Sequence, residues 1–364
     1  PRGDRPFPLP RRPRVGTFTS PMPSHFTHLV FAEEALNRAL GDEAATILRT
    51  HGNLLRFAAQ GPDIFYHNQR TMPTGLRYGV ALHKHGYGTM VGELVREARR
   101  LGMGPATELA AFTLGFATHA ILDRYTHPYI IHFAGWDEGG RQGDNRVYHT
   151  HPFLERILDL LVLGERRGLE PSQFDFLSLV RLAHGLPYPV LKALVKGLHA
   201  IYPTFARKSL DRARIENAYH DTVFFYKLTN HLNAELPHMA WKKDRKDGFR
   251  QRRLGLLHPR EVPPGVDFLN RERRPWCHPC DDTALSHEGF LDLYARALDE
   301  SVRTVTILHA ALSGRASIEE AAAAVSDFSL DTGRDPCTPR FSNPFPLREI
   351  LDAEYRRLEA SPAR

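Results

Sequence analysis

The sequence predicts an all-α fold, from its hydrophobic periodicity, its composition and the scarcity of alternating polar and apolar residues. Apolar residues recur with the 3.6-residue period of helices through most of the 364-residue chain. Hydrophobic residues make up 42% and charged residues 25%, which is ordinary for a globular protein. No repeat period is visible, so we expect a large helical core with long connections.

Nine segments carry the helical period, and one of them is strongly apolar. Residues 106–122 contain Glu108 and His119, and no apolar run reaches the ~20 residues that a membrane span needs. We therefore expect a buried helix there and no transmembrane segment. The nine expected helices are 28–59, 89–101, 105–133, 151–166, 172–184, 189–201, 206–235, 286–313 and 316–326.

Composition divides the chain into four parts. Residues 1–23 form a flexible Pro- and Arg-rich arm that lacks the apolar core of a secretory signal. Residues 24–235 hold the main helical domain. Residues 236–285 break the helical pattern with Pro, Gly and charge, and residues 286–364 form a C-terminal helical appendage with an irregular tail.

The three cysteines are too few for a disulfide scaffold, since only Cys277, Cys280 and Cys337 are present. They indicate a reducing compartment, so we expect a cytoplasmic protein, or a secreted one whose leader has been removed. The C-x2-C spacing in WCHPC also suits a second zinc site, completed by Cys337, His278 or Asp281. A redox pair and a plain turn with buried thiols are the alternatives.

The stretch HAILDRYTH places three metal-ligand side chains at four-residue steps, namely His119, Asp123 and His127. An α-helix turns about 100° per residue, so positions four apart lie on one stripe and can share a metal or bridge two ions. The alternative is a buried helix whose polar groups satisfy one another. Further histidine and carboxylate clusters favour metal binding.

Four other places carry the same residue types. His151 and Glu155 lie one turn apart in HPFLE, where Pro152 suits the first turn of a helix. Asp63 follows Gly-Pro in QGPDIFYHN, a position where an aspartate is otherwise a simple cap. Histidine is the commonest zinc ligand, and carboxylates complete sites for two or more ions. The remaining candidates are His83 and His28, with His85 and His25 close by in sequence.

In chain order the clusters read His, Asp, His, then H-x3-D followed closely by His, then H-x3-E. This ordered set resembles the zinc-dependent phospholipase C family and its relatives, the single-strand-specific zinc nucleases. The local sequences THLVFAEEAL, QGPDIFYH and HAILDRYTHP look like the broad bacterial branch of that family, and the resemblance covers roughly residues 24 to 230. It implies an all-helical domain with two to three zinc ions at the bottom of a cleft.

Carried over residue by residue, the resemblance assigns each candidate to an ion. Asp63, His83 and His119 would bind the first ion. Asp123 would bridge it to a second ion, held by His28. The remaining ion would be held by His127, His151 and Glu155.

The chain departs from the family pattern in two places. The family usually has five residues between the Asp and the next His, whereas three separate Asp123 from His127, so His132 is an alternative to His127. Secreted members also use the amine and carbonyl of a processed N-terminal Trp as ligands, and no Trp lies near His28. The ion beside His28 therefore needs another partner, for which His25 is a candidate.

The chemistry that such a cluster implies is phosphodiester hydrolysis by a metal-activated water. Asp63 is the expected catalytic residue, as a ligand that also orients or deprotonates the attacking water. No Ser, Cys or Thr nucleophile with a neighbouring base is apparent, so we expect no covalent intermediate. The substrate would be a phosphate ester, either a lipid head group or, as in a zinc nuclease, single-stranded nucleic acid or a nucleotide. The non-enzymatic alternative is a helical binding protein with closed, structural metal sites.

The positive charge and a His–Asp pair give further indications of the binding partners and of the enzyme class. The net charge of +6 and the run KKDRKDGFRQRR at 242–253 suit phosphate substrates and peripheral contact with anionic surfaces, although such a run is often just a solvated loop. The pair His220–Asp221 in AYHDTVFFY suggests the HD-type phosphohydrolases, with a satisfied helical pair as the simpler interpretation. The oligomeric state is not encoded in any pattern that we identify.

Overall fold

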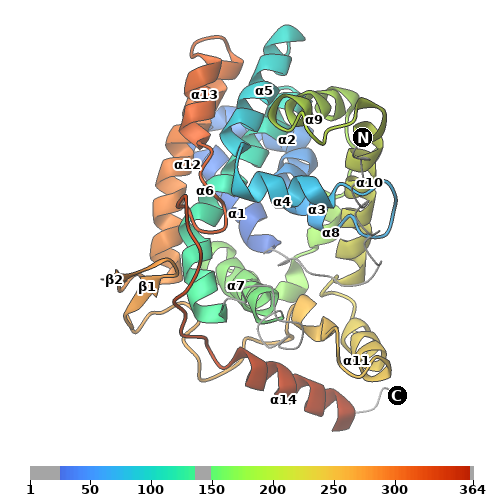
Figure 1. Cartoon of the computed structure of the whole chain (residues 1–364), viewed down its shortest axis with the longest axis vertical. Helices are drawn as coiled ribbons and strands as arrows, with labels where there is room; N and C mark the ends of the chain where they lie inside the picture. The colour runs from blue at the N-terminus through green and yellow to red at the C-terminus, as the bar shows by residue number, and fades with distance from the viewer. Residues whose placement is uncertain (1–24, 136–148, 361–364) are drawn as a thin grey trace, which may run out of the picture.

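The computed structural model describes residues 25–135 and 149–360, and these residues form an all-α fold (Figure 1). They contain fourteen α-helices, two short 3-10 helices and one antiparallel hairpin. The expected fold class is therefore confirmed. The N-terminal arm expected at 1–23 lies outside the described residues.

The first half of the chain supplies the helices that carry the expected ligands. The α-helices of this half are α1 (Phe26–Leu40), α2 (Asp42–Ala58), α3 (Asp63–Tyr66), α4 (Leu76–Lys84), α5 (Tyr87–Arg100), α6 (Glu108–Ala134) and α7 (Thr150–Arg167). After α7 come η1 (Pro171–Gln173), α8 (Phe176–Val180), α9 (Tyr188–Ile201) and α10 (Lys208–Leu228).

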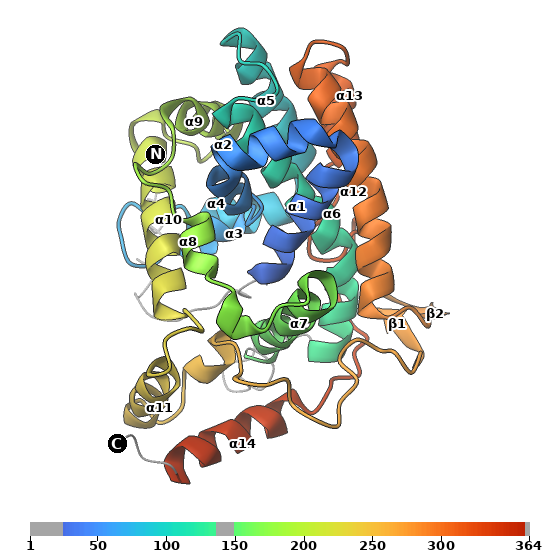
Figure 2. The same cartoon turned by 180° about the vertical axis from the view of Figure 1, so that it is seen from behind.

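The rest of the described chain adds a hairpin, four α-helices and one 3-10 helix. These elements are α11 (Leu236–Lys246), η2 (Arg253–Leu256), β1 (Trp276–His278), β2 (Asp281–Ser286), α12 (Phe290–Leu312), α13 (Ile318–Val325) and α14 (Leu347–Ala360). Helix α12 packs along α6 and α1, and α13 packs against α5 (Figure 2). The proposed division into a domain at 24–235 and a later appendage stays a prediction.

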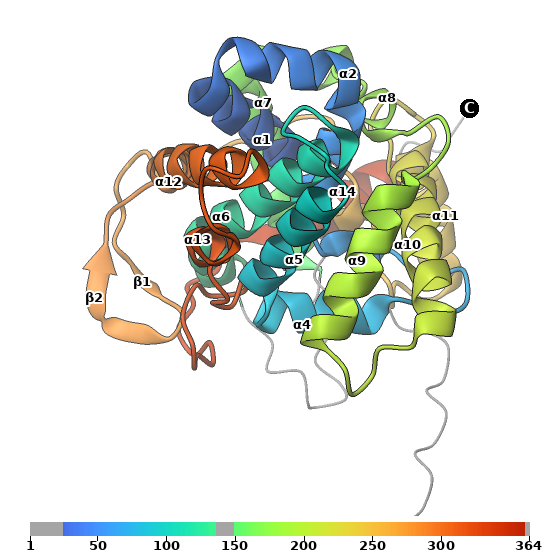
Figure 3. The same cartoon turned by 90° about the horizontal axis from the view of Figure 1, so that it is seen from above.

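Helix α6 lies at the centre of the molecule, as the apolar run at 106–122 predicts. Seen from above, α5 and α6 lie between α12 and α13 on one side and α9 and α10 on the other (Figure 3). Most of α6 is buried, and Gly115 lets α2 approach closely, because a Cβ atom there would lie 2.2 Å from the carbonyl oxygen of Leu55. The stripe of polar residues on α6 is therefore enclosed by protein.

The structure corrects several expected element boundaries. The helix expected over 28–59 is two helices, because Gly41 adopts a φ of 54° and ends α1. In the segment expected over 172–184, only α8 is α-helical, since the chain turns into an extended conformation at Arg181. Helices α4, α11 and α14 lie outside the nine expected helices.

Two of the three cysteines are not the buried free thiols that the plain-turn alternative would contain. Cys280 and Cys337 form a disulfide with their Cα atoms 5.8 Å apart, and Cys277 is free and buried. The bond links the β1–β2 hairpin to the segment that precedes α14, which sequence spacing alone did not pair. None of the described helices is long and apolar enough to cross a membrane.

Candidate metal centre

The structure brings all eight expected ligands into one buried region. They come from α1, α3, α4, α6 and α7, so the enclosing helices fix each side chain by packing rather than by a flexible loop. The eight are His28, Asp63, His83, His119, Asp123, His127, His151 and Glu155, and all of them are buried.

Two carboxylates lie between three histidines in the deeper part of the centre. His83 Nε2 is 3.0 Å from Asp63 Oδ1, and His119 Nε2 is 3.6 Å from Asp63 Oδ2. Asp123 extends the cluster, with Oδ2 2.9 Å from His119 Nε2 and Oδ1 3.2 Å from His28 Nε2. His119 therefore contacts both carboxylates, and its ring stacks on that of His28 at 4.3 Å.

The second part of the centre joins α6 to α7. Glu155 Oε1 lies 3.3 Å from His151 Nε2 and 3.6 Å from His127 Nε2. His127 Nε2 is also 3.7 Å from Asp123 Oδ1, which connects this part to the deeper one. Each i,i+4 pair expected from the sequence lies on one helix face, as helical geometry requires.

Backbone carbonyls orient three of the histidine rings. A carbonyl oxygen only accepts hydrogen bonds, so each Nδ1 must carry a proton and each Nε2 presents its lone pair to the carboxylates unless it is protonated. This is how proteins orient histidine ligands. The contacts are His83 Nδ1 to Gly79 O at 2.8 Å, His119 Nδ1 to Ala59 O at 3.1 Å and His127 Nδ1 to Leu330 O at 3.0 Å.

Zinc fits this donor set. A neutral ring would point its Nε2 lone pair at a carboxylate, so either a proton or a cation must lie between them. Ligands of tetrahedral zinc lie about 3.3 Å apart, which is close to the 2.9–3.7 Å between these nitrogen and oxygen atoms. Both Oδ atoms of Asp63, Oδ2 of Asp123 and Oε2 of Glu155 lack a hydrogen-bond partner among the described residues. Three groups of ligand atoms lie close enough together to hold an ion, namely His28–Asp63–His119, His83–His119–Asp123 and His127–His151–Glu155.

The electrostatics of the centre favour charged rings and carboxylates. Burial opposes the imidazolium form, but neighbouring carboxylates outweigh it and raise the pKa of His83 to about 9 and that of His127 to about 10. Burial likewise favours a neutral acid, yet the surrounding histidines hold the pKa of Asp123 well below its usual value and lower that of Glu155. A metal ion would replace the protons that these rings otherwise bind.

The three less certain candidates do not join the cluster. The side chain of His25 contacts Arg156 at 3.0 Å and stacks on Phe176. His85 is exposed, and its ring contacts Tyr202. His132 lies beside Cys277, with Nδ1 3.9 Å from the sulfur, so it does not replace His127 in this arrangement.

The C-x2-C motif and the His220–Asp221 pair make contacts elsewhere in the protein. Cys280, Cys337 and His278 are close enough to share an ion, but the disulfide engages both sulfurs and His278 Nε2 contacts the carbonyl of Thr332 at 2.9 Å. Asp221 accepts hydrogen bonds from the backbone N–H groups of Arg70 and Thr71, while the neighbouring His220 is exposed. Asp221 therefore orders a loop, which agrees with the simpler interpretation of that pair.

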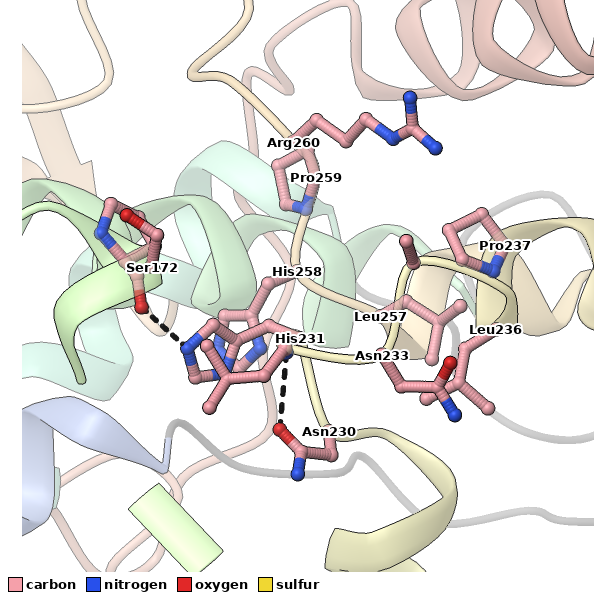
Figure 4. Close-up of a pocket in the computed structure, with 13 residues that line it drawn as sticks. Ser172, Asn230, His231, Asn233, Leu236, Pro237, Leu257, His258, Pro259 and Arg260 are labelled. Atoms are coloured by element: carbon pink, nitrogen blue, oxygen red, sulfur yellow. Dashed lines mark hydrogen bonds between the residues drawn. The ribbon is translucent and has the colours of Figure 1, made fainter. Parts of the chain in front are cut away.

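A separate pocket of about 240 Å³ lies between η1, the end of α10, the start of α11 and residues 257–260 (Figure 4). His231 and His258 line it, and none of the eight expected ligands does. The Nε2–H of His258 donates to Asp159 Oδ2 at 2.9 Å, and burial lowers the pKa of His258 to about 4. The pocket is thus distinct from the metal centre.

Residues 326–335 contact the metal centre, although we expected them to belong to the end of a helix and to the irregular tail. Leu330 supplies the carbonyl that orients His127, and its N–H donates to the carbonyl of His83 at 2.7 Å. No periodicity or spacing marks such a contact, because 203 residues separate Leu330 from His127.

The fold and the centre define a helical protein with a buried cluster of histidine and carboxylate side chains that could hold metal. Comparison with known families agrees with this class: residues 27–206 match the family model of zinc-dependent phospholipase C, which confirms the resemblance. Neither the curated proteins nor the solved structures gave a match.

Proposed function

We propose that the protein is a zinc-dependent phosphoesterase that hydrolyses phosphodiesters in the manner of phospholipase C. The observation that carries this proposal is the set of Nε2 atoms turned by backbone carbonyls toward buried carboxylates, several of whose oxygens lack a hydrogen-bond partner among the described residues. The match of residues 27–206 to the family model of zinc-dependent phospholipase C supports a zinc-dependent hydrolase.

We assign the ions as the resemblance to the family implies. Asp63, His83 and His119 would hold one ion, and Asp123 would bridge it to another beside His28. The third would lie between His127, His151 and Glu155. Zinc in such sites polarises the phosphoryl group and lowers the pKa of a coordinated water to near 7.

The protein's own groups would position the reactants. The Asp63 carboxylate, held between His83 and His119, is the proposed acceptor that orients the attacking water and takes its proton. Carbonyl contacts to Nδ1 keep His83, His119 and His127 in the tautomer that exposes Nε2. Exclusion of bulk water by the surrounding helices strengthens these interactions.

A direct test measures zinc and turnover in the same preparation. Full-length protein purified without chelator should contain two to three zinc ions and should hydrolyse bis-p-nitrophenyl phosphate. A phospholipid diester and single-stranded DNA then distinguish the phospholipase from the nuclease alternative. One ion or none, or full metal content with no hydrolysis of any of the three, would contradict the proposal.

Asp123→Asn is the matched variant, because it keeps the shape of the side chain but removes the proposed bridging charge. We expect zinc content and turnover to fall together, with turnover reduced at least a hundredfold. Asp299→Asn, on the exposed face of α12, is the control and should change neither. Normal zinc content and turnover in Asp123→Asn would rule out the bridge.

A further inference from the structure

One edge of the molecule, formed by the loop before α4, the end of α10 and α11, exposes apolar and basic side chains together. All three views place α10 and α11 at this edge, on the opposite side of the molecule from the β1–β2 hairpin (Figure 1, Figure 2 and Figure 3). We call residues 69–73, 224–232 and 236–246 the α10–α11 face. Five of the twelve large apolar side chains that are exposed in the described residues belong to it, namely Met72, Phe224, Leu228, Leu232 and Met239.

Hydrogen bonds fix the loop part of this face along α10. The backbone N–H groups of residues 70 and 71 donate to the carboxylate of Asp221 at 3.0 and 2.9 Å. The side-chain amide of Asn217 donates to the carbonyl of Pro73 at 3.1 Å. Met72 lies between these anchored residues and is 78% exposed. The fold thus holds an apolar side chain out to solvent at a defined position.

The end of α10 continues the apolar part of the face. Phe224 and Leu228 are four residues apart, so they lie on one side of the helix. Both are exposed, and the guanidinium of Arg70 lies 4.4 Å from the centre of the Phe224 ring. Single exposed apolar residues are ordinary on a protein surface, but a group of them at one edge is typical of a site that contacts a protein or a membrane.

Helix α11 supplies the basic part of the face. Three exposed lysines lie three, four and seven residues after Met239, namely Lys242, Lys243 and Lys246. These spacings place the lysines on the same side of the helix as Met239, which is 57% exposed. The only acidic residue of α11 is Asp244, which is buried and pairs with an arginine of η2 instead. No carboxylate among the described residues therefore forms an ion pair with the three lysines.

We propose that the α10–α11 face docks on the surface of a lipid bilayer that contains anionic phospholipids. The three lysines of α11 would contact the phosphate groups of the lipids. Met72, Leu228 and Met239 would enter the apolar layer beneath those groups. The inference goes beyond the proposed function, because docking needs neither zinc nor catalysis.

The two kinds of side chain together favour a bilayer over other partners. Single-stranded nucleic acid would pair with the lysines, but its bases stack on aromatic rings, which methionines and leucines do not offer. A second copy of the chain would bring the same lysines together, and like charges across an interface oppose binding. An anionic bilayer supplies negative charge and an apolar layer at one surface.

The α10–α11 face also lies close to the proposed catalytic region. The buried side of α10 contacts α3, where the hydroxyl of Thr222 donates to the carbonyl of Ile64 at 3.0 Å. Asp63 directly precedes Ile64 at the start of α3. The face is therefore on the outer side of a helix whose inner side contacts the element that carries Asp63.

Co-sedimentation of the full-length protein with vesicles tests the docking. Wild-type protein should bind vesicles of phosphatidylcholine mixed with phosphatidylglycerol, and binding should weaken in high salt, which screens the lysines. The triple variant Lys242→Ala, Lys243→Ala, Lys246→Ala should bind about a hundredfold more weakly, since each cation near an anionic surface contributes about fivefold. Met72→Ser combined with Met239→Ser should weaken binding at least tenfold, because the apolar contacts are lost.

Two variants remove the same kinds of group elsewhere and serve as controls. Leu285→Ser changes an apolar side chain of the hairpin that is 64% exposed, and Arg303→Ala changes an exposed cation of α12. Both should bind the mixed vesicles as the wild type does. Every variant should keep the Tm of the wild type, because all of the changed side chains are exposed.

Four results would overturn the inference. Wild-type protein that stays in the supernatant with the mixed vesicles would exclude docking. Equal losses in Leu285→Ser and in the methionine variant would show that binding is not specific to this face. Without vesicle binding, lysine-dependent binding of a single-stranded oligonucleotide would identify a nucleic-acid surface, and a dimer that dissociates in the methionine variant would assign the face to a second copy. Docking by protein that lacks zinc or phosphodiesterase activity would support the inference while contradicting the proposed function.

Discussion

At the scale of single residues, the centre depends on which atoms of each histidine are already engaged. Ala59 is an ordinary alanine in sequence, yet its carbonyl fixes the ring of His119. The spacing of His119, Asp123 and His127 predicts which side chains meet, because it follows from helix geometry. The spacing does not predict which backbone carbonyl orients each ring, because tertiary packing brings that carbonyl to the ring.

The raised pKa values give a prediction for the metal-free protein. His83 and His127 have pKa values of about 9 and about 10, against about 6.5 in an unfolded chain. The folded state thus binds these protons more tightly, and this stabilisation is complete below pH ~6.5 and is lost as pH rises through the folded values. Chelator-treated protein should therefore show a Tm that falls between about pH 6.5 and 9.

Zinc reverses this trend, because it competes with the same protons for Nε2. The difference in Tm between zinc-loaded and chelator-treated protein should grow as pH rises over the same interval. Asp123 and Glu155 do not disturb the comparison, since their lowered pKa values matter only below about pH 4. A metal-free Tm that rises between pH 6.5 and 9 would be inconsistent with these shifts.

At the scale of elements, the hydrophobic periodicity predicted the long helices well but predicted poorly where a helix is interrupted. The 27 residues of α6 form a helix close to the one expected at 105–133, because their apolar content is continuous. Gly41 divides the expected helix at 28–59, since a glycine inside an apolar pattern gives no sign of whether it adopts a positive φ. Helix α14 was missed because prolines surround a short amphipathic run.

The close packing of α6 on α2 predicts the effect of one methyl group. Gly115→Ala would place Cβ 2.2 Å from Leu55 O, so α2 must move, and we expect a loss of about 1–3 kcal/mol in unfolding free energy. Because Ala59 directly follows α2, zinc affinity should fall too. Urea denaturation and chelator competition measure the two effects.

Gly164→Ala on α7 is the control for this packing prediction. No atom lies within 4 Å of the added Cβ, and alanine is the better helix former, so the unfolding free energy should rise by about 0.5–1 kcal/mol. Equal stability of the two variants would mean that the α2–α6 contact tolerates a side chain at residue 115.

At the scale of the whole molecule, the disulfide closes a large loop around α12 and α13. Cys280 and Cys337 are 57 residues apart, and in the chain-entropy account such a cross-link stabilises the fold by about 4 kcal/mol. Dithiothreitol should lower the denaturation midpoint of the wild type and leave that of the double variant Cys280→Ser, Cys337→Ser unchanged. Cys277→Ala, which removes the free thiol, should respond to dithiothreitol as the wild type does.

The position of Leu330 in the chain also sets the order in which the centre is completed during synthesis. Residues 27–206 leave the ribosome first, and all eight proposed ligands are among them. At 5–20 residues per second, Leu330 follows Ala206 after about 6 to 25 s. During that interval the ring of His127 lacks the carbonyl of Leu330 that orients it. The nascent chain then contains all eight proposed ligands, but the ring of His127 is not yet fixed in its final orientation. We therefore expect the proposed zinc ions to reach their final arrangement only in the last stage of folding.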